Sequence, residues 1–187
     1  MNVRLAEQNG AYKVEINGGI IEPLSFKTFR PACRNVSDFA KAGVRIINVI
    51  STGLNSILGV PYSLYGESWV GDGNYDFDVV DRQMEFFIKN APDAYFALDT
   101  RPWYLKENPG CPNSFLCLSQ VADDQKWRKA ASDYLKAMIR HAEDKFGDRI
   151  YGYFILGGTT TEWFSDKDYG ETHPYKEAAY KKYMRNP

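Results

Sequence analysis

The chain has 187 residues, with 23 Lys and Arg against 24 Asp and Glu, and its formal net charge is −1. This balance argues against a dedicated nucleic-acid binder, which would show a basic excess or stripe. Hydrophobic residues make up 44% of the chain and aromatic residues 15%. We therefore expect a single folded domain over residues 1–187, whose aromatic residues either pack in the core or form a surface for flat apolar ligands.

Membrane, metal and disulfide signals are weak in this sequence. No apolar run reaches the roughly 18 residues of a membrane span, and residues 1–10 lack the apolar core of a secretory signal. We expect a soluble chain without a membrane partner, whose compartment the sequence does not define. Cys33, Cys111 and Cys117 lack metal-ligand spacing, so we expect neither a metal site nor a cofactor. Cys111 and Cys117 could pair in an oxidising compartment, but we expect unlinked thiols.

The hydrophobic pattern predicts a leading β-hairpin over residues 1–19, followed by four strands that each precede a helix. Turn signals at Asn9-Gly10 and Asn17-Gly18-Gly19 mark the hairpin region. The predicted strands cover residues 20–26, 44–51, 94–100 and 150–156, and the predicted helices cover residues 35–42, 76–90 (with Asp76 as N-cap), 123–145 and 175–184. Long loops without strand or helix period separate them at residues 54–75 and 101–122.

This alternation predicts an α/β fold with right-handed parallel crossovers. A doubly wound domain would fit the length, but its glycine-rich phosphate-binding turn is absent from the sequence. A (β/α)₈ barrel of the TIM type places its active site on the loops after the strands, which is where the long aromatic-rich loops lie. Eight units need about 250 residues and only four are visible. We therefore interpret the chain as the first four βα units of a barrel.

The segment Ile150–Phe164 carries the strongest chemical signal. Its strand breaks at Gly157-Gly158, passes three threonines and reaches Glu162 beside Trp163. A carboxylate at the end of a buried strand and next to an indole can have its pKa raised by desolvation. The alternative is a solvent-facing glutamate in a connecting loop.

Several segments together carry a family resemblance: residues 21–31 (IEPLSFKTFRP), 73–81 (GNYDFDVVD), 102–104, 108–109, 126–128 and 151–163. On these segments the sequence resembles the clan A glycoside hydrolases, and is similar to the family 42 β-galactosidases and their uncharacterised relatives. The resemblance covers only the first half of the family's catalytic barrel. In that clan the general acid/base is a glutamate after the fourth strand, which the resemblance places at Glu162.

Two departures from the clan pattern affect this interpretation. The clan has an asparagine directly before the acid/base, whereas this chain has Thr161. Retaining glycosidases also need a second carboxylate about 5–5.5 Å from the first, and the clan takes this nucleophile from the seventh strand. Asp99, Glu67 and Glu107 are the other carboxylates at the predicted mouth, where the resemblance implies at most sugar binding.

Further candidates for substrate binding are aromatic and basic residues of the loops. Trp163, Trp103 and Trp69 could stack on sugar faces or pack within their own loops. Arg101 and Arg30 could hydrogen-bond sugar hydroxyls or pair with mouth carboxylates.

Two further polar residues have structural interpretations. We expect Asn48 to point into the barrel, satisfied by polar neighbours. We expect His141 to be a surface residue at a helix end.

The sequence thus predicts a fragment of a retaining glycoside hydrolase that acts on β-linked sugars, with β-galactosides suggested by the resemblance. This fragment would carry the acid/base but not the nucleophile, and the isolated chain would be inactive. The alternative is a non-catalytic carbohydrate-binding or half-barrel assembly module. Exposed sheet edges would then favour a homodimer.

Overall fold

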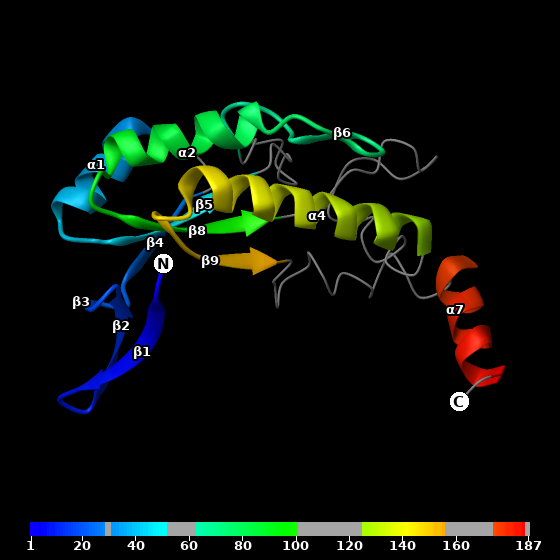
Figure 1. The fold of residues 1–187 in the computed structure, drawn as a ribbon, viewed down its shortest axis with the longest axis horizontal. Helices are drawn as coiled ribbons and strands as arrows, with labels where there is room; N and C mark the ends of the chain where they lie inside the picture. The colour runs from blue at the N-terminus through cyan, green and yellow to red at the C-terminus, as the bar shows by residue number, and fades with distance from the viewer. Residues whose placement is uncertain (29–30, 52–62, 101–124, 156–173, 186–187) are drawn as a thin grey trace.

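A computed structural model describes residues 1–28, 31–51, 63–100, 125–155 and 174–185 (Figure 1). Its elements in chain order are β1 (Val3–Gln8), β2 (Ala11–Ile16), β3 (Gly19–Ile21), β4 (Ser25–Lys27), α1 (Cys33–Lys41), β5 (Ile46–Ile50), β6 (Trp69–Gly71), β7 (Asn74–Tyr75), α2 (Asp78–Asn90), β8 (Tyr95–Thr100), α4 (Gln125–Phe146), β9 (Ile150–Ile155) and α7 (Pro174–Arg185). The four predicted βα units therefore each appear as a strand and a helix.

The leading hairpin is confirmed and continues into a third antiparallel strand, giving the order β1-β2-β3. Both connections are two-residue turns with left-handed backbone, since φ is 53° at Asn9, 75° at Gly10, 50° at Asn17 and 85° at Gly18. Positive φ at both central residues defines the type I′ turn, whose twist matches that of the flanking strands. The predicted continuous strand over residues 20–26 is wrong. It splits into β3 and β4, and Pro23, which has no N–H to donate to a ladder, lies in the break.

The central sheet is parallel and has the order β4-β5-β8-β9, so its strands lie side by side in chain order. This confirms the predicted parallel α/β arrangement. All five residues of β5 are buried, as the unbroken apolar run predicted for a strand covered on both faces.

The helices α1, α2 and α4 lie on one side of this sheet (Figure 1). The sheet residues facing them are Phe26, Ile47, Val49, Phe96 and Leu98, which share one face by register. The same cluster contains Val36 of α1, Val80, Met84 and Phe87 of α2, and Tyr134, Met138 and Ala142 of α4. One hydrophobic core therefore joins the sheet to the three helices that follow β4, β5 and β8.

The segment before α2 differs from the prediction. Asp76 is not the N-cap, because its backbone N–H donates to the carbonyl of Ser68 (2.8 Å) and the cap position is Phe77, without a side-chain hydrogen bond. Asp78 and Asp81 instead supply negative charge in the first turn, which favours the helix amino terminus. The predicted loop at residues 54–75 also contains the short antiparallel pair β6 and β7.

Candidate functional site

The face of the sheet that points away from the helices carries polar side chains from three neighbouring strands. Lys27 of β4 pairs in register with Asn48 of β5, and Asn48 pairs with Ala97 of β8. Asp99 lies two residues beyond Ala97, so it projects on the same side. These side chains therefore gather near the carboxyl ends of β4, β5 and β8, the end at which parallel α/β sheets bind ligands.

Lys27 and Asp99 form an ion pair that crosses the middle strand. The distance from Lys27 Nζ to Asp99 Oδ2 is 2.7 Å, and β5 lies between their strands. The Asp99 side chain is only 4% exposed, whereas that of Lys27 is 36% exposed. The Asp99 backbone is also fixed, because the Ser51 N–H and hydroxyl both donate to its carbonyl at 3.2 and 3.0 Å. Asp99, predicted as a sugar-binding residue, is thus held rigidly and opposite a cation.

Asn48 corrects one prediction. Its residue exposure is 9% and its Oδ1 atom is buried, but this oxygen has no hydrogen-bond partner in the part of the chain that the structure describes. The prediction that polar neighbours satisfy this side chain is therefore wrong for its oxygen. A buried polar atom without a partner costs about 1–3 kcal/mol, and such atoms are rare in native structures. The Lys27 ammonium is the nearest charged neighbour by register, but it donates to Asp99 instead.

Phe154 stands beside Asp99 on the same face. The two residues pair in register between β9 and β8. The preceding residue, Tyr153, points to the helix side, where its hydroxyl donates to Glu143 of α4 (2.8 Å). Because side chains alternate along a strand, Phe154 faces the side of Asp99, and it is 48% exposed. Phe154 was not singled out from the sequence, although alternation along the predicted strand already placed it on the face opposite to Tyr153.

Trp69 lies in the core. It is 4% exposed, its indole N–H donates to the Gly71 carbonyl (2.9 Å), and its ring stacks on Tyr134 with centroids 5.0 Å apart. The Tyr134 hydroxyl is 2.6 Å from the Ser68 hydroxyl, and both residues are fully buried. Trp69 was a candidate either for stacking on a sugar or for packing within its loop, and the observed contacts are those of packing.

Burial raises the pKa of Tyr75, Tyr134, Tyr151 and Tyr153, and the shifts at Tyr134 and Tyr153 are large. Desolvation raises the pKa of Tyr134 to about 12, with the Ser68 hydroxyl acting in the opposite direction. Desolvation also raises the pKa of Tyr153, and the hydrogen bond and negative charge of Glu143 add to that rise. Both phenols therefore stay protonated at neutral pH and serve as hydrogen-bond donors or acceptors.

No protein-family model, curated protein or solved structure matches the chain. The assignment of a function therefore depends on this chain's own residues. Within the described ranges, no group of three or more His, Cys, Asp or Glu side chains is placed to hold a metal ion. In the same ranges, no helix is long and apolar enough to cross a membrane.

Several predicted residues lie outside the described residues. They are the proposed acid/base Glu162, the substrate-binding candidates Trp163, Trp103, Arg101 and Arg30, and the cysteines Cys111 and Cys117. Of the predicted site residues, the structure therefore places Asp99 at the polar face and Trp69 in the core.

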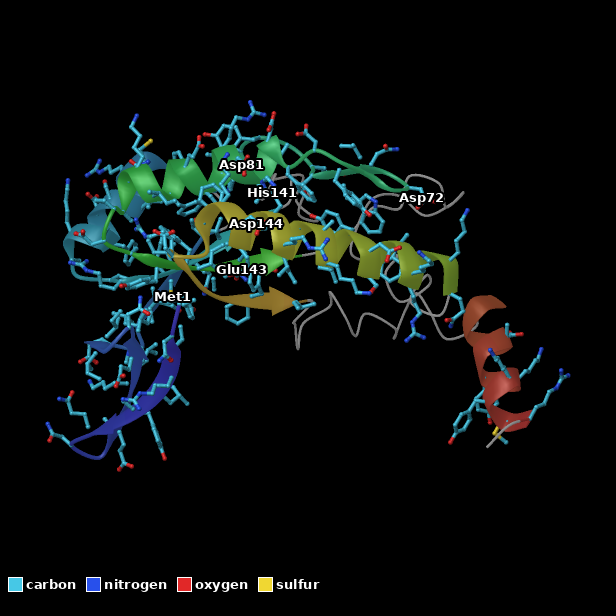
Figure 2. All side chains as sticks on the ribbon, in the orientation of Figure 1. Met1, Asp72, Asp81, His141, Glu143 and Asp144 are labelled. Atoms are coloured by element: carbon cyan, nitrogen blue, oxygen red, sulfur yellow. The ribbon has the colours of Figure 1, made fainter. Side chains whose placement is uncertain are left out.

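A second charged cluster joins α2 to α4. Asp81 is 7% exposed and accepts from Lys145 Nζ at 2.6 Å, and its other oxygen is 2.7 Å from His141 Nε2 (Figure 2). The hydrogen bond to Asp81 raises the pKa of Lys145. His141 also stacks on Phe77. The expectation of a surface histidine at a helix end is wrong, because His141 is a partly buried contact between two helices.

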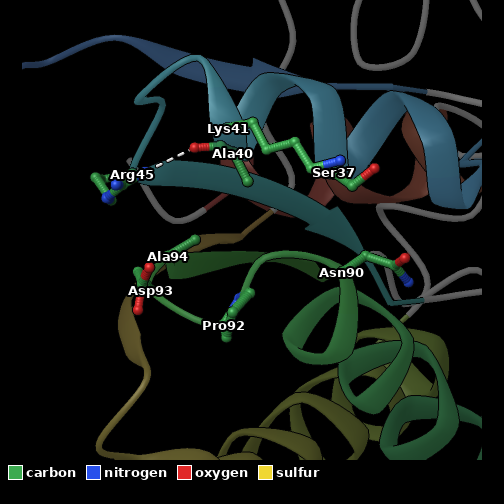
Figure 3. Close-up of a pocket in the computed structure, with 8 residues that line it drawn as sticks. All are labelled: Ser37, Ala40, Lys41, Arg45, Asn90, Pro92, Asp93 and Ala94. Carbon is green, nitrogen blue, oxygen red and sulfur yellow. Dashed lines mark hydrogen bonds between the residues drawn. The ribbon is translucent and has the colours of Figure 1, made fainter.

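A cleft of about 300 Å³ lies at the other end of the sheet (Figure 3). Its lining includes Lys41, Arg45, Asn90 and Asp93. Arg45 directly precedes β5, so the cleft lies at the amino-terminal ends of the strands, away from the polar face. Arg45 donates to the Ala40 carbonyl (2.8 Å), as the dashed line in Figure 3 marks. Its guanidinium thus secures the end of α1.

Proposed function

We propose that the chain forms the first half of a (β/α)₈ catalytic barrel in a retaining glycoside hydrolase for β-linked sugars. The supporting observation is the arrangement of β4, β5, β8 and β9 in chain order, with α1, α2 and α4, the helices that follow the first three of these strands, on one side of the sheet. A doubly wound domain would place helices on both faces of its sheet, whereas a barrel places all of them outside.

The polar face supports this proposal. In a closed barrel the face away from the helices is the interior, and the carboxyl ends of its strands form the mouth. Lys27, Asn48 and Asp99 lie on that face at that end. A mixture of a cation, a carboxylate and an amide suits a neutral ligand with many hydroxyl groups.

Glu162 is the proposed general acid/base, seven residues beyond the end of β9. As an acid it would protonate the leaving glycosidic oxygen, and as a carboxylate it would then activate water against the glycosyl-enzyme intermediate. The nucleophile would come from a later strand. Eight strands close such a barrel, so we propose that the remaining strands come from a continuation of the chain. The resemblance suggests β-galactosides as substrates.

The leaving group of the substrate tests this role. In the protein that contains the complete barrel, Glu162→Gln should slow hydrolysis of an alkyl β-glycoside by at least 10²-fold. The loss should be much smaller at the first chemical step with a dinitrophenyl β-glycoside, because that leaving group departs without protonation. Glu177→Gln on α7 is the matched control and should have no effect. Equal losses for both substrates, or near-normal turnover, would remove Glu162 from the acid role.

The alternative is a half-barrel module that binds carbohydrate without catalysis. This alternative is favoured by β9, which is the last strand in the described sheet order. Two of its side chains are exposed, Phe154 at 48% and Ile155 at 51%. An exposed edge of this kind can pair with a second copy. Light scattering of the chain tests the assembly, since a stable monomer at high concentration would contradict the homodimer.

A further inference from the structure

Asn48 Oδ1 is a buried acceptor beside a side chain that reaches solvent. This side chain is Lys27, the neighbour of Asn48 in register, which is 36% exposed. Among the residues that the structure describes, none donates a hydrogen bond to this amide oxygen. It is therefore available to accept a hydrogen bond from a ligand hydroxyl.

The charges around Asn48 favour a neutral ligand. The Lys27 ammonium and the Asp99 carboxylate already compensate each other at 2.7 Å. A ligand anion would have to compete with Asp99 for Lys27, and a ligand cation would have to compete with Lys27 for Asp99. A hydroxyl group avoids both conflicts, because it can accept from the ammonium and donate to the amide oxygen or the carboxylate.

Phe154 adds an apolar surface next to these groups. It lies beside Asp99 in register and presents about half of its surface to solvent. An aromatic ring beside several hydrogen-bonding groups matches a sugar, which has apolar C–H faces and polar edges.

We propose that Asn48, Lys27 and Asp99 bind neighbouring hydroxyl groups of a neutral pyranose, whose C–H face lies against Phe154. One hydroxyl donates to Asn48 Oδ1 and accepts from Lys27 Nζ, and the next donates to the Asp99 carboxylate. The choice of a sugar among neutral polyols rests on the proposed function. Asn48, Lys27 and Phe154 thereby become determinants of substrate binding.

The Asn48→Leu variant tests the proposal with two readouts, because it should keep or raise the stability of the fold while it lowers the affinity for a glycoside. Leucine has nearly the same volume and removes an amide that has no internal partner for its oxygen, so the melting temperature should stay the same or rise. The Kd for methyl β-D-galactopyranoside or methyl β-D-glucopyranoside, measured by NMR titration, should rise about tenfold because a buried hydrogen bond is lost. Asn35→Leu, at an exposed position of α1, is the matched control and should leave Kd unchanged.

Four results would overturn the proposal. A marked fall in the melting temperature of Asn48→Leu would show that an internal partner such as water satisfies the amide. Unchanged affinity of this variant, or no glycoside binding by the wild-type protein, would exclude a sugar contact. Tighter binding of methyl β-D-glucuronide, which carries a carboxylate, would contradict a neutral ligand.

The test of this sugar site and the test of Glu162 as acid/base can fail separately. Loss of glycoside affinity in Asn48→Leu without any dependence of hydrolysis on Glu162 would support this site and refute the proposed acid/base. Glu162-dependent hydrolysis with unchanged affinity in Asn48→Leu would support the enzyme and refute the site.

Discussion

The hydrogen bond between Tyr134 and Ser68 should contribute measurably to stability, and the Tyr134→Phe variant tests this. The two hydroxyl oxygens are 2.6 Å apart and both residues are fully buried. Phenylalanine keeps the ring and its stacking on Trp69, but it leaves the Ser68 hydroxyl buried without its partner. That change should lower the free energy of unfolding by about 1–3 kcal/mol.

This loss corresponds to a visible shift in thermal unfolding. In a domain of this size, each kcal/mol lowers the melting temperature by about 2–4 °C, so the shift for Tyr134→Phe should be about 2–12 °C by circular dichroism. Tyr12→Phe, at a position that is 69% exposed, is the control and should leave the melting temperature unchanged.

The double variant separates the bond from its surroundings. Ser68→Ala with Tyr134→Phe removes both hydroxyls together, so its loss should be smaller than the sum of the two single losses. Strictly additive losses, or a Tyr134→Phe protein as stable as the wild type, would refute the reasoning.

Three further predictions concern the fold. The pKa of Tyr134 is about 12 in the folded chain and about 10 in the unfolded one, so its contribution to stability is complete below pH 10 and is lost as pH rises to about 12. Between these pH values the free energy of unfolding, measured in urea, should fall by up to about 1.4 kcal/mol per pH unit because of this group. The Tyr134→Phe variant should show a shallower slope, and equal slopes would contradict the assignment. Asp81→Asn weakens the contacts of α2 with His141 and Lys145 on α4 and should lower the melting temperature by several degrees, while the exposed Asp144→Asn should not; equal shifts would show that the cluster adds no stability. Gly18→Ala should cost about 1–2 kcal/mol in denaturant unfolding because φ is 85°, whereas Gly152→Ala, which also points into open space without a positive φ, should cost less, and a reversed order would contradict the turn.

The elements of the fold were largely predictable because local signals agreed. Asn-Gly pairs at positions 9–10 and 17–18 encode type I′ turns without help from the rest of the chain. The apolar run around β5 likewise encodes a strand that is buried on both faces. The predicted N-cap failed because a contact with another segment replaces the local cue. Asp76 has a typical N-cap side chain, but its backbone N–H is bonded to the Ser68 carbonyl and the cap position is Phe77.

The site was less predictable, because it depends on register. Lys27, Asn48 and Asp99 are more than twenty residues apart from one to the next, and only the pairing of β4, β5 and β8 brings them together. The buried contact of His141 with Asp81 depends in the same way on the packing of α4 against α2. Sequence patterns assign residues to a face of a strand or helix, but they do not state which faces meet.

The stereochemistry of hydrolysis tests the central claim most directly. The protein with the complete barrel should cleave an aryl β-glycoside, and proton NMR should show the β-anomer of the released sugar first, as two displacements at the anomeric carbon require. Formation of the α-anomer first, or no cleavage of any aryl β-glycoside by that protein, would contradict the account.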